Sequence, residues 1–249
     1  NVMYLGLVSN NTEVGYYTTA FKLYSVILGF FTAFTNVMLP RMSSLLANGE
    51  KDRFQELVNR SFSVMATCCI PLILCSMIMA PQIVYILSGP GYEGAILPMR
   101  IIMPAAFAVG VAQVLAIQVL MPMKKDKVLL IASIIGAVVS LLINLLVVPS
   151  VKSVGSAVVL LCSEMGVTGM YVWYVLSQEL ILIPIKAIGK NVLFSLPSVV
   201  ICLGCGRWID NELLGVGCAV VLAGILWMLL QIIIRSLVGE RIKNLFFKI

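Results

Sequence analysis

Residues 124–152 have the sequence KKDKVLLIASIIGAVVSLLINLLVVPSVK, in which a charged loop precedes a long apolar run and a short turn. The run from Val128 to Val148 carries no charge. It has the length of about 20 residues that an α-helix needs to cross a bilayer. Lipid-exposed backbone must be helical or belong to a closed barrel, and barrel strands would alternate apolar and polar residues. This run does not alternate, so it predicts a transmembrane helix.

Similar apolar runs occupy most of the chain. Of its residues, 61% are hydrophobic and 11% are charged, and the mean hydropathy is +1.06. A soluble domain is about half apolar and a quarter charged. We therefore predict an all-α, polytopic transmembrane helix bundle with about seven full spans, preceded at 1–8 by the last turns of another. The full spans are expected at 15–40, 61–87, 96–122, 128–148, 154–176, 191–209 and 214–237.

Positive charges alternate between the connections. Of the 17 lysines and arginines, 13 fall in four segments, while the intervening connections carry almost none. An excess of Lys and Arg on every second loop marks the cytoplasmic side of a membrane protein. The pattern thus predicts a cytoplasmic C-terminus. The four segments are 41–60, 124–127, 186–190 and 235–248.

Two of the cation-rich stretches are long enough to form structure of their own. Arg41–Arg60 mixes apolar and charged residues, which predicts an amphipathic helix in the headgroup layer. Ser177–Lys190 is a second candidate for the interface. We divide the chain into a bundle at 1–176 and a part at 177–249 that holds an interfacial segment, two further spans and a cytoplasmic tail. Because Asn1 lies in the last turns of a span, we expect a C-terminal fragment of a longer protein.

Composition argues against several kinds of chemistry. There is no histidine, which excludes His-dependent triads, His metal sites and imidazole proton relays within these residues. All seven cysteines lie in apolar runs, so the CxxC of Cys202 and Cys205 is interpreted as packing rather than a redox or zinc site. The net charge of +6 comes from cations beside the spans, which favours anionic lipid over nucleic acid. We expect no metal and no cofactor.

Polar and small residues form a stripe along the first full span. Their spacings of four and three residues place them on one side of a helix through nearly the whole membrane. Such a stripe faces either neighbouring helices or a cavity. Lys22 favours a cavity, because a cation about 10 Å inside the boundary costs roughly 2.5–3.5 kcal/mol unless it reaches water or an anion. Snorkelling to the outer headgroups is the alternative. The stripe comprises Thr18, Lys22, Ser25, Gly29, Thr32 and Asn36.

Two other charged residues lie inside predicted spans. Arg100 is on the same membrane side as Lys22, between Pro98 and Pro104, which would bend its helix and free backbone carbonyls. Lys22 and Arg100 together would suit a phosphate or another polyanion, although Arg100 is shallow enough to snorkel. Glu164 lies near the midplane. It could couple a proton or Na⁺, pair with Lys22, or stay neutral and hydrogen-bonded between helices.

The remaining polar residues inside spans carry less weight. Ser133, Ser140 and Asn144 share a face that we interpret as a packing face first and a cavity face second. Gln113 and Gln118 are isolated and give no pattern.

Several short motifs follow one another along residues 1–176. They are Val14–Tyr17, Lys22, Leu39–Ser43, Gly89–Tyr92, Arg100, Gln118–Pro122, Lys124–Lys127, Gly136, Asn144, Pro149, Gly155, Ala157 and Glu164. In order and spacing they resemble the Wzx-type polysaccharide flippases of the multidrug/oligosaccharidyl-lipid/polysaccharide exporter superfamily. Each motif alone is weakly specific, and the spans after residue 176 match only in hydropathy.

The resemblance implies two six-helix halves around a central cavity, with this chain as the second half. It also implies translocation of a sugar repeat unit on an undecaprenyl pyrophosphate carrier across the bacterial inner membrane, without covalent chemistry. Expected partners are this lipid-linked oligosaccharide and membrane lipids, with a polysaccharide polymerase and chain-length machinery as further candidates. Glu164 is the candidate for ion coupling or buried pairing. The expected substrate-binding residues are Lys22, Arg100, Thr18, Ser25, Thr32 and Asn36.

Three alternatives remain open at this point. A multidrug antiporter would favour an acidic cavity, whereas the candidate cavity residues here are mostly cationic. A lipid II flippase has a similar fold. A membrane polysaccharide polymerase would carry its catalytic residues on a sizeable outer loop, and the outer loops predicted here do not exceed about ten residues.

Overall fold

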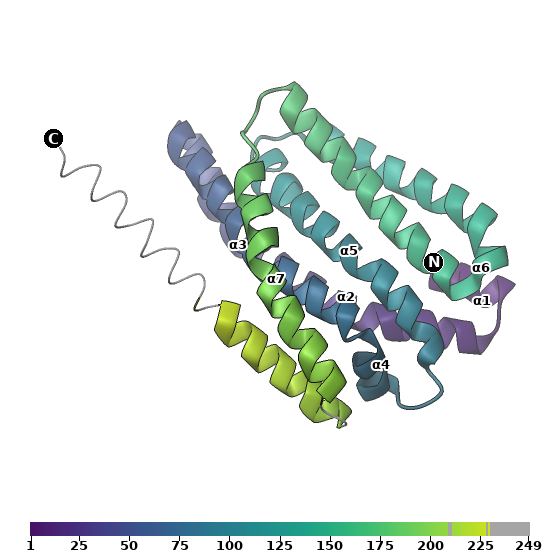
Figure 1. The fold of residues 1–249 in the computed structure, drawn as a ribbon. Coiled ribbons are helices and arrows are strands. Elements are labelled where there is room, and N and C mark those ends of the chain that lie inside the picture. The colour runs from purple at the N-terminus through teal and green to yellow at the C-terminus, as the bar shows by residue number, and fades with distance from the viewer. Residues whose placement is uncertain (209–210, 228, 230–249) are drawn as a thin grey trace.

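Helices account for most of the described residues, as a backbone surrounded by lipid requires. The computed structural model describes residues 1–208, 211–227 and 229, and no strand occurs among them (Figure 1). Five of its helices are long and apolar enough to cross a membrane. The prediction of an all-α, multi-pass membrane bundle is therefore confirmed. The elements are α1 (Val2–Val8), α2 (Asn11–Ala47), α3 (Lys51–Ile78), α4 (Ala80–Ser88), η1 (Glu93–Ala95), α5 (Ile96–Gln113), η2 (Val114–Leu120), α6 (Asp126–Ser177) and α7 (Ile185–Trp208).

Helix α6 contains two of the predicted spans, 128–148 and 154–176, as two adjacent legs (Figure 1). Between the legs Lys152 has φ 53° and ψ −122°, which reverses the chain. The first backbone N–H of the second leg, at Ser153, donates to the carboxylate of Glu13 on α2 at 3.2 Å. A carboxylate is favourable there because the first N–H groups of a helix lack intrahelical partners and carry partial positive charge.

The last predicted span, 214–237, is described only in part. Its first portion lies in an apolar helix at Glu212–Trp227. Apart from Leu229, the rest of this span lies outside the described residues. The cationic tail at 235–248 and the predicted position of the C-terminus lie outside them as well.

The second predicted span has the wrong bounds. The sequence predicts it at 61–87, but α3 covers Lys51–Ile78 and is followed by a separate short helix, α4. Pro81 explains the interruption, because it has no N–H to donate to the carbonyl of Met77 four residues earlier. The helical conformation is lost at Met79, where φ is −88° and ψ is 17°.

The predicted amphipathic helix at Arg41–Arg60 is also wrong. Helices α2 and α3 both continue into this segment and meet in a tight turn, in which Gly49 has φ 73°. The apolar side chains of Phe54, Leu57 and Val58 are buried in the main core rather than directed at headgroups. Local amphipathicity could not distinguish a helix in the headgroup layer from a helix packed on the core, because both require one apolar face.

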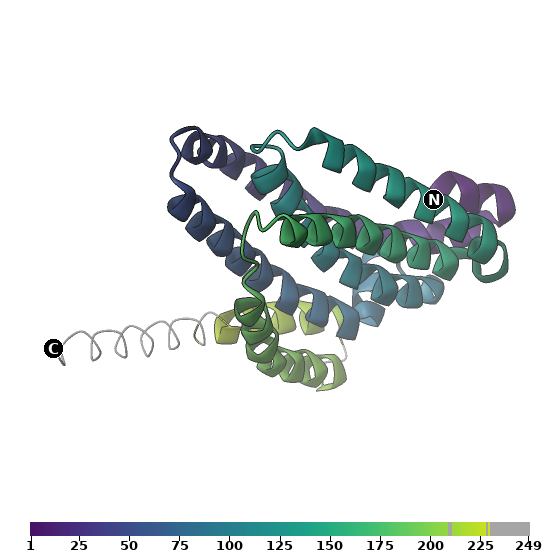
Figure 2. The same ribbon diagram turned by 90° about the horizontal axis from the view of Figure 1, so that it is seen from above.

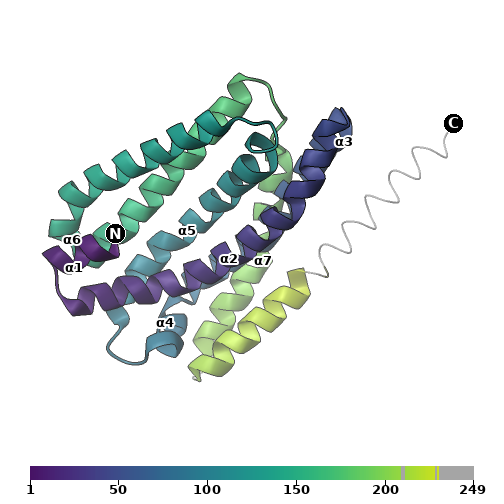
Figure 3. The same cartoon turned by 180° about the vertical axis from the view of Figure 1, so that it is seen from behind.

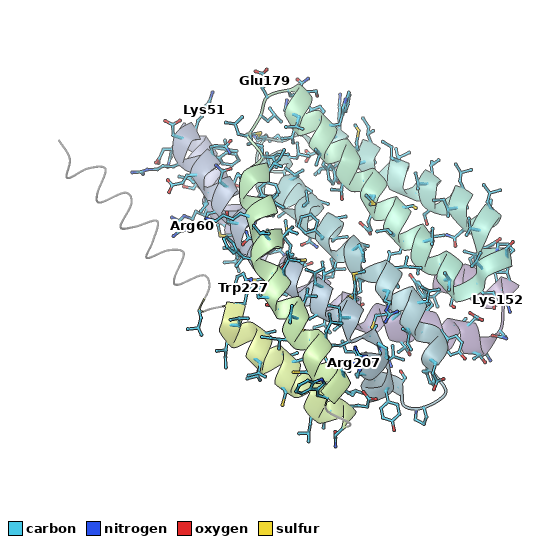
Figure 4. All side chains as sticks on the ribbon, in the orientation of Figure 1. Lys51, Arg60, Lys152, Glu179, Arg207 and Trp227 are labelled. Atoms are coloured by element: carbon cyan, nitrogen blue, oxygen red, sulfur yellow. The ribbon has the colours of Figure 1, made fainter. Side chains whose placement is uncertain are left out.

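The connections lie at two ends of the bundle. Figure 4 shows Lys51 and Glu179 at one end and Lys152 and Arg207 at the other. This arrangement agrees with the alternation of loops expected from the sequence. That the end with Lys51 faces the cytoplasm stays a prediction.

Helix α5 lies at the centre of the main core and packs against α2, α3 and α6. Met99, Ile102 and Met103 on α5 have no exposed surface. Helix α7 and the helix after it lie to one side, away from α6 (Figure 2). There they form a second, smaller apolar cluster with the end of α3. Its buried members are Met79, Cys202, Ala219 and Ala223. The boundary between 1–176 and 177–249 stays a prediction.

The connection between α6 and α7 is non-helical and is held by one side chain of α3. Gln55 donates from Nε2 to the carbonyl of Leu182 at 2.9 Å and accepts from the N–H of Leu182 at 2.9 Å. The amide thus completes both backbone hydrogen bonds of Leu182, much as a neighbouring strand would.

Two of the short sequence motifs pack against each other at the end of the bundle that includes Lys152. The rings of Tyr16 and Tyr92 meet edge to face with centroids 6.0 Å apart. A Cβ added to Gly15 would lie 3.3 Å from the ring of Tyr92, and one added to Gly94 would overlap the ring of Tyr16. At both positions, an aromatic ring occupies the space that a larger side chain would need.

We expect Gly94→Ala to destabilise the protein by about 1–3 kcal/mol, because the added methyl group has to displace the Tyr16 ring. Thermal unfolding of the purified protein in detergent measures this change. Gly169→Ala is the matched control, since nothing lies within 4 Å of a Cβ at that helical position. An unfolding temperature for Gly94→Ala equal to that of Gly169→Ala would contradict the packing argument.

Candidate functional site

Helix α2 presents the predicted stripe on a face that the described helices leave largely open. In Figure 3, α2 lies at the front of the view with no other described helix across it. On the adjoining face Val26 and Val37 are 71% and 78% exposed, so this side of α2 requires lipid or further protein to cover it. Among the stripe residues, Thr18 and Thr32 are half-buried, whereas Lys22, Ser25, Gly29 and Asn36 are exposed.

The hydroxyl groups of the stripe are fixed by their own helix. Thr18 donates to the carbonyl of Gly15 at 3.1 Å, and Ser25 donates to that of Phe21 at 2.9 Å. With its proton engaged in this way, a hydroxyl can still accept a hydrogen bond through its lone pairs. Thr18 and Ser25 are therefore suited to a ligand that donates hydrogen bonds, such as a sugar hydroxyl.

Thr32 has a different environment from Thr18 and Ser25. Gln113 of α5 donates from Nε2 to Oγ1 of Thr32 at 2.9 Å, and its Oε1 accepts from the hydroxyl of buried Thr35 at 3.3 Å. From the sequence, Thr32 could face either a neighbouring helix or a cavity. This contact places it in the interface between α2 and α5. Gln113 was missed as a structural residue. The sequence did contain a signal for this role, because an amide side chain inside a membrane span is costly unless it has a hydrogen-bond partner.

Arg100 is directed toward α3 rather than toward the stripe. Its Nε donates to the carbonyl of Met77 at 3.1 Å, which is the carbonyl left free by Pro81. Lys22, in contrast, is exposed on α2 and makes no hydrogen bond or ion pair with the described residues. The two cations that the sequence grouped together therefore have different surroundings, and Arg100 has a clear role in holding the α3–α4 interruption.

Glu164 lies half-buried on the second leg of α6. Within residues 1–208 and 211–227 its carboxyl group makes no hydrogen bond or ion pair, so the considered pairing with Lys22 is not formed. One turn later, Thr168 donates to the carbonyl of Ala108 at 2.9 Å and fixes this leg to α5.

The polar face of the first α6 leg is in part a packing face. Asn144 is buried and donates from Nδ2 to Oδ1 of Asn1 at 2.8 Å, and the hydroxyl of Ser140 donates to the same oxygen at 3.3 Å. Ser133, in contrast, is exposed. The described residues contain no group of three or more acidic or cysteine side chains that could hold a metal ion.

Comparison with known proteins agrees with this architecture. The family described as "Polysaccharide biosynthesis protein" matches residues 1–97. Over 181 residues the chain is 28% identical to the "Putative O-antigen transporter" of Escherichia coli (strain K12), covering 72% of this chain and 43% of that protein. The resemblance to the Wzx-type flippases is confirmed.

A solved structure shares the fold. The lipid II flippase MurJ, in an inward closed conformation, superposes with a TM-score of 0.76 over 91% of this chain and 48% of that chain, at 16% sequence identity. This likeness shows a MurJ-like fold. The chain spans less than half the length of either relative.

We expect Gln113→Leu to lower the free energy of unfolding by about 0.6–1.7 kcal/mol, the range for interhelical hydrogen bonds in membranes. The change removes both contacts between α2 and α5 made by this amide. Gln178→Leu is the control, because it makes the same replacement on an exposed side chain beyond α6. Denaturant unfolding in mixed micelles measures both variants. Equal stability of the two would show that the amide network contributes nothing.

Arg100→Gln is expected to destabilise the protein by about 1 kcal/mol, since it removes the guanidinium that satisfies the Met77 carbonyl. Lys22→Gln makes a similar loss of charge without breaking any described contact, so its unfolding temperature should match that of the wild type. The comparison is made by thermal unfolding in detergent. A loss of stability confined to Lys22→Gln would reverse the structural assignment of the two cations.

Proposed function

We propose that the chain is the second half of a flippase for undecaprenyl-pyrophosphate-linked oligosaccharide repeat units in the bacterial inner membrane. The similarity to the O-antigen transporter and the MurJ-like fold support this proposal. In this scheme another half-bundle faces the open side of α2. Alternating access would move the two halves against each other around a site between them. The chain would perform no covalent chemistry.

The observation that carries the proposal is the open polar face of α2 with Lys22 in it. Lys22 makes no ion pair or hydrogen bond with any described residue, so its ammonium group is available to a ligand. A phosphate group of the carrier would supply the anion that offsets the cost of a cation at this depth. Thr18 and Ser25 on the same face would accept hydrogen bonds from sugar hydroxyls.

The remaining candidates have graded roles in this proposal. Asn36 is exposed on the same face and would line the cavity nearer the opposite end of α2. Thr32 and Arg100 would act mainly by positioning helices, through Gln113 and Met77. Glu164 is half-buried and without a described hydrogen bond, which leaves ion coupling as its proposed role.

A lipid II flippase is the second candidate, because of the structural likeness to MurJ. Both substrates are polyprenyl diphosphates that carry sugars, so an ammonium group and hydroxyl acceptors suit either. The peptide of lipid II is the chemical difference. Rescue of cells depleted of their own lipid II flippase separates the two proposals, since a repeat-unit flippase should not restore growth.

Replacing Lys22 tests the proposed site. In cells that depend on the intact protein, we expect Lys22→Gln to reduce export of the repeat unit by roughly tenfold or more, the loss of about 1.5–3 kcal/mol of charge-assisted binding. Surface polysaccharide and the lipid-linked repeat unit that accumulates inside the cell are both measured.

Lys127→Gln is the matched control, because Lys127 is exposed in the first turn of α6 and lies outside the stripe. It should export at the wild-type rate at equal membrane abundance. Wild-type export by Lys22→Gln, or an equal loss in both variants, would rule out a substrate-binding role for Lys22.

A further inference from the structure

A cluster of cations lies where α2 meets α3. It surrounds a cavity of about 250 Å³. Arg41 is 19 positions after Lys22 on the same helix, which separates them by roughly 28 Å along its axis. The cavity is therefore distinct from the open stripe at Lys22. The lining residues are Arg41, Leu45, Arg53, Glu56, Leu57 and Arg60.

The cavity is built from two helices. Arg53, Glu56 and Arg60 are spaced so that they share one face of α3, and Arg41 approaches from α2. Leu45 and the buried Leu57 give it an apolar part. Figure 4 shows Arg60 on α3 further from the tip of that helix than Lys51.

Two of the three arginines of this pocket have no partner among the described residues. Arg53 pairs with Glu50 at 2.6 Å, and this is the one ion pair found in the described chain. Arg41 and Arg60 make neither an ion pair nor a hydrogen bond there. Glu56 is four residues before Arg60, the spacing at which a helical ion pair could form, yet none is present. Two guanidinium groups thus line the cavity with their donors unused.

The positive-inside pattern accounts for cations at this end of the bundle, but it does not require them to converge. The lining carries three arginines and one carboxylate, Glu56, so cations outnumber anions there and a further anion would reduce their repulsion. Guanidinium groups bind phosphate through paired N–H···O bonds, which makes Arg the preferred residue for such anions. Basic pockets between transmembrane helices on the cytoplasmic side bind lipid headgroups.

We propose that the pocket of Arg41, Arg53 and Arg60 binds the phosphate group of a lipid at the cation-rich end of the bundle. Arg41 and Arg60 hold the phosphate oxygens, and Leu45 and Leu57 contact the carbon atoms next to the phosphate. The lipid is either an anionic phospholipid or the polyprenyl diphosphate carrier, which present the same chemistry. Binding at this pocket does not depend on the proposed function, because it is measured without transport.

Native mass spectrometry of the delipidated, intact protein tests this site with two probes, dioleoylphosphatidylglycerol and undecaprenyl pyrophosphate. We expect Arg41→Gln/Arg60→Gln to weaken binding of at least one probe by about tenfold or more, since each cation near an anionic headgroup contributes about 1 kcal/mol. Loss with both probes, or with the phospholipid alone, identifies a phospholipid site. Loss confined to undecaprenyl pyrophosphate identifies a carrier site.

Lys51→Gln/Lys127→Gln is the matched control, with the same loss of charge at exposed positions outside the pocket. It should weaken binding of either probe by less than the arginine variant does, because neither lysine lines the pocket. Unaltered binding of both probes by the arginine variant, or an equal loss in the lysine variant, overturns the proposal. Should the glutamine variant fail to fold, Arg41→Lys/Arg60→Lys keeps the charge and removes the paired geometry. Binding by that variant at the wild-type level overturns the proposal as well.

Discussion

A backbone polar group in lipid has no water to bond, so each interruption of a helix has to be completed by other parts of the protein. At three places where described helices are interrupted or joined, a polar side chain from a different helix supplies the missing partner. Each of these contacts joins segments that are distant in the sequence. The pairs are Arg100 with Met77, Glu13 with Ser153, and Gln55 with Leu182. The interruptions of the described helices are thereby also points where separate helices and connections are joined.

This requirement separates the polar residues inside the membrane into two groups. Arg100 and Gln113 complete the structure, the first at a free carbonyl and the second between two threonines. Lys22 and Glu164 form no hydrogen bond or ion pair with any described residue. A cation and a carboxyl group without structural partners are costly in a membrane, and such residues most often serve transport. Of the two cations, Arg100 and Lys22, only Lys22 therefore has no structural role among the described residues.

The sequence predicted the spans well where hydropathy alone decides them. The uncharged run at 128–148 and its neighbour at 154–176 are the two legs of α6, and the reversal falls between them as expected. Prediction was wrong at Met79, although Pro81 was a visible signal for a break. It was also wrong at Arg41–Arg60, because an apolar face can pack on headgroups or on a core. Of the candidate site, the stripe was found, but the separate surroundings of Thr32 and Arg100 were not.

By itself the sequence determined that the chain is a multi-pass helical membrane protein, and it indicated which loops share a side. Hydropathy and charge suffice for this because each helix partitions into the bilayer largely on its own composition. Only the tertiary structure decided which polar residues meet. That outcome depends on how each helix is rotated about its axis against its neighbours, and a one-dimensional pattern does not contain this rotation. For the same reason, the convergence of Arg41, Arg53 and Arg60 on one cavity became visible only after folding.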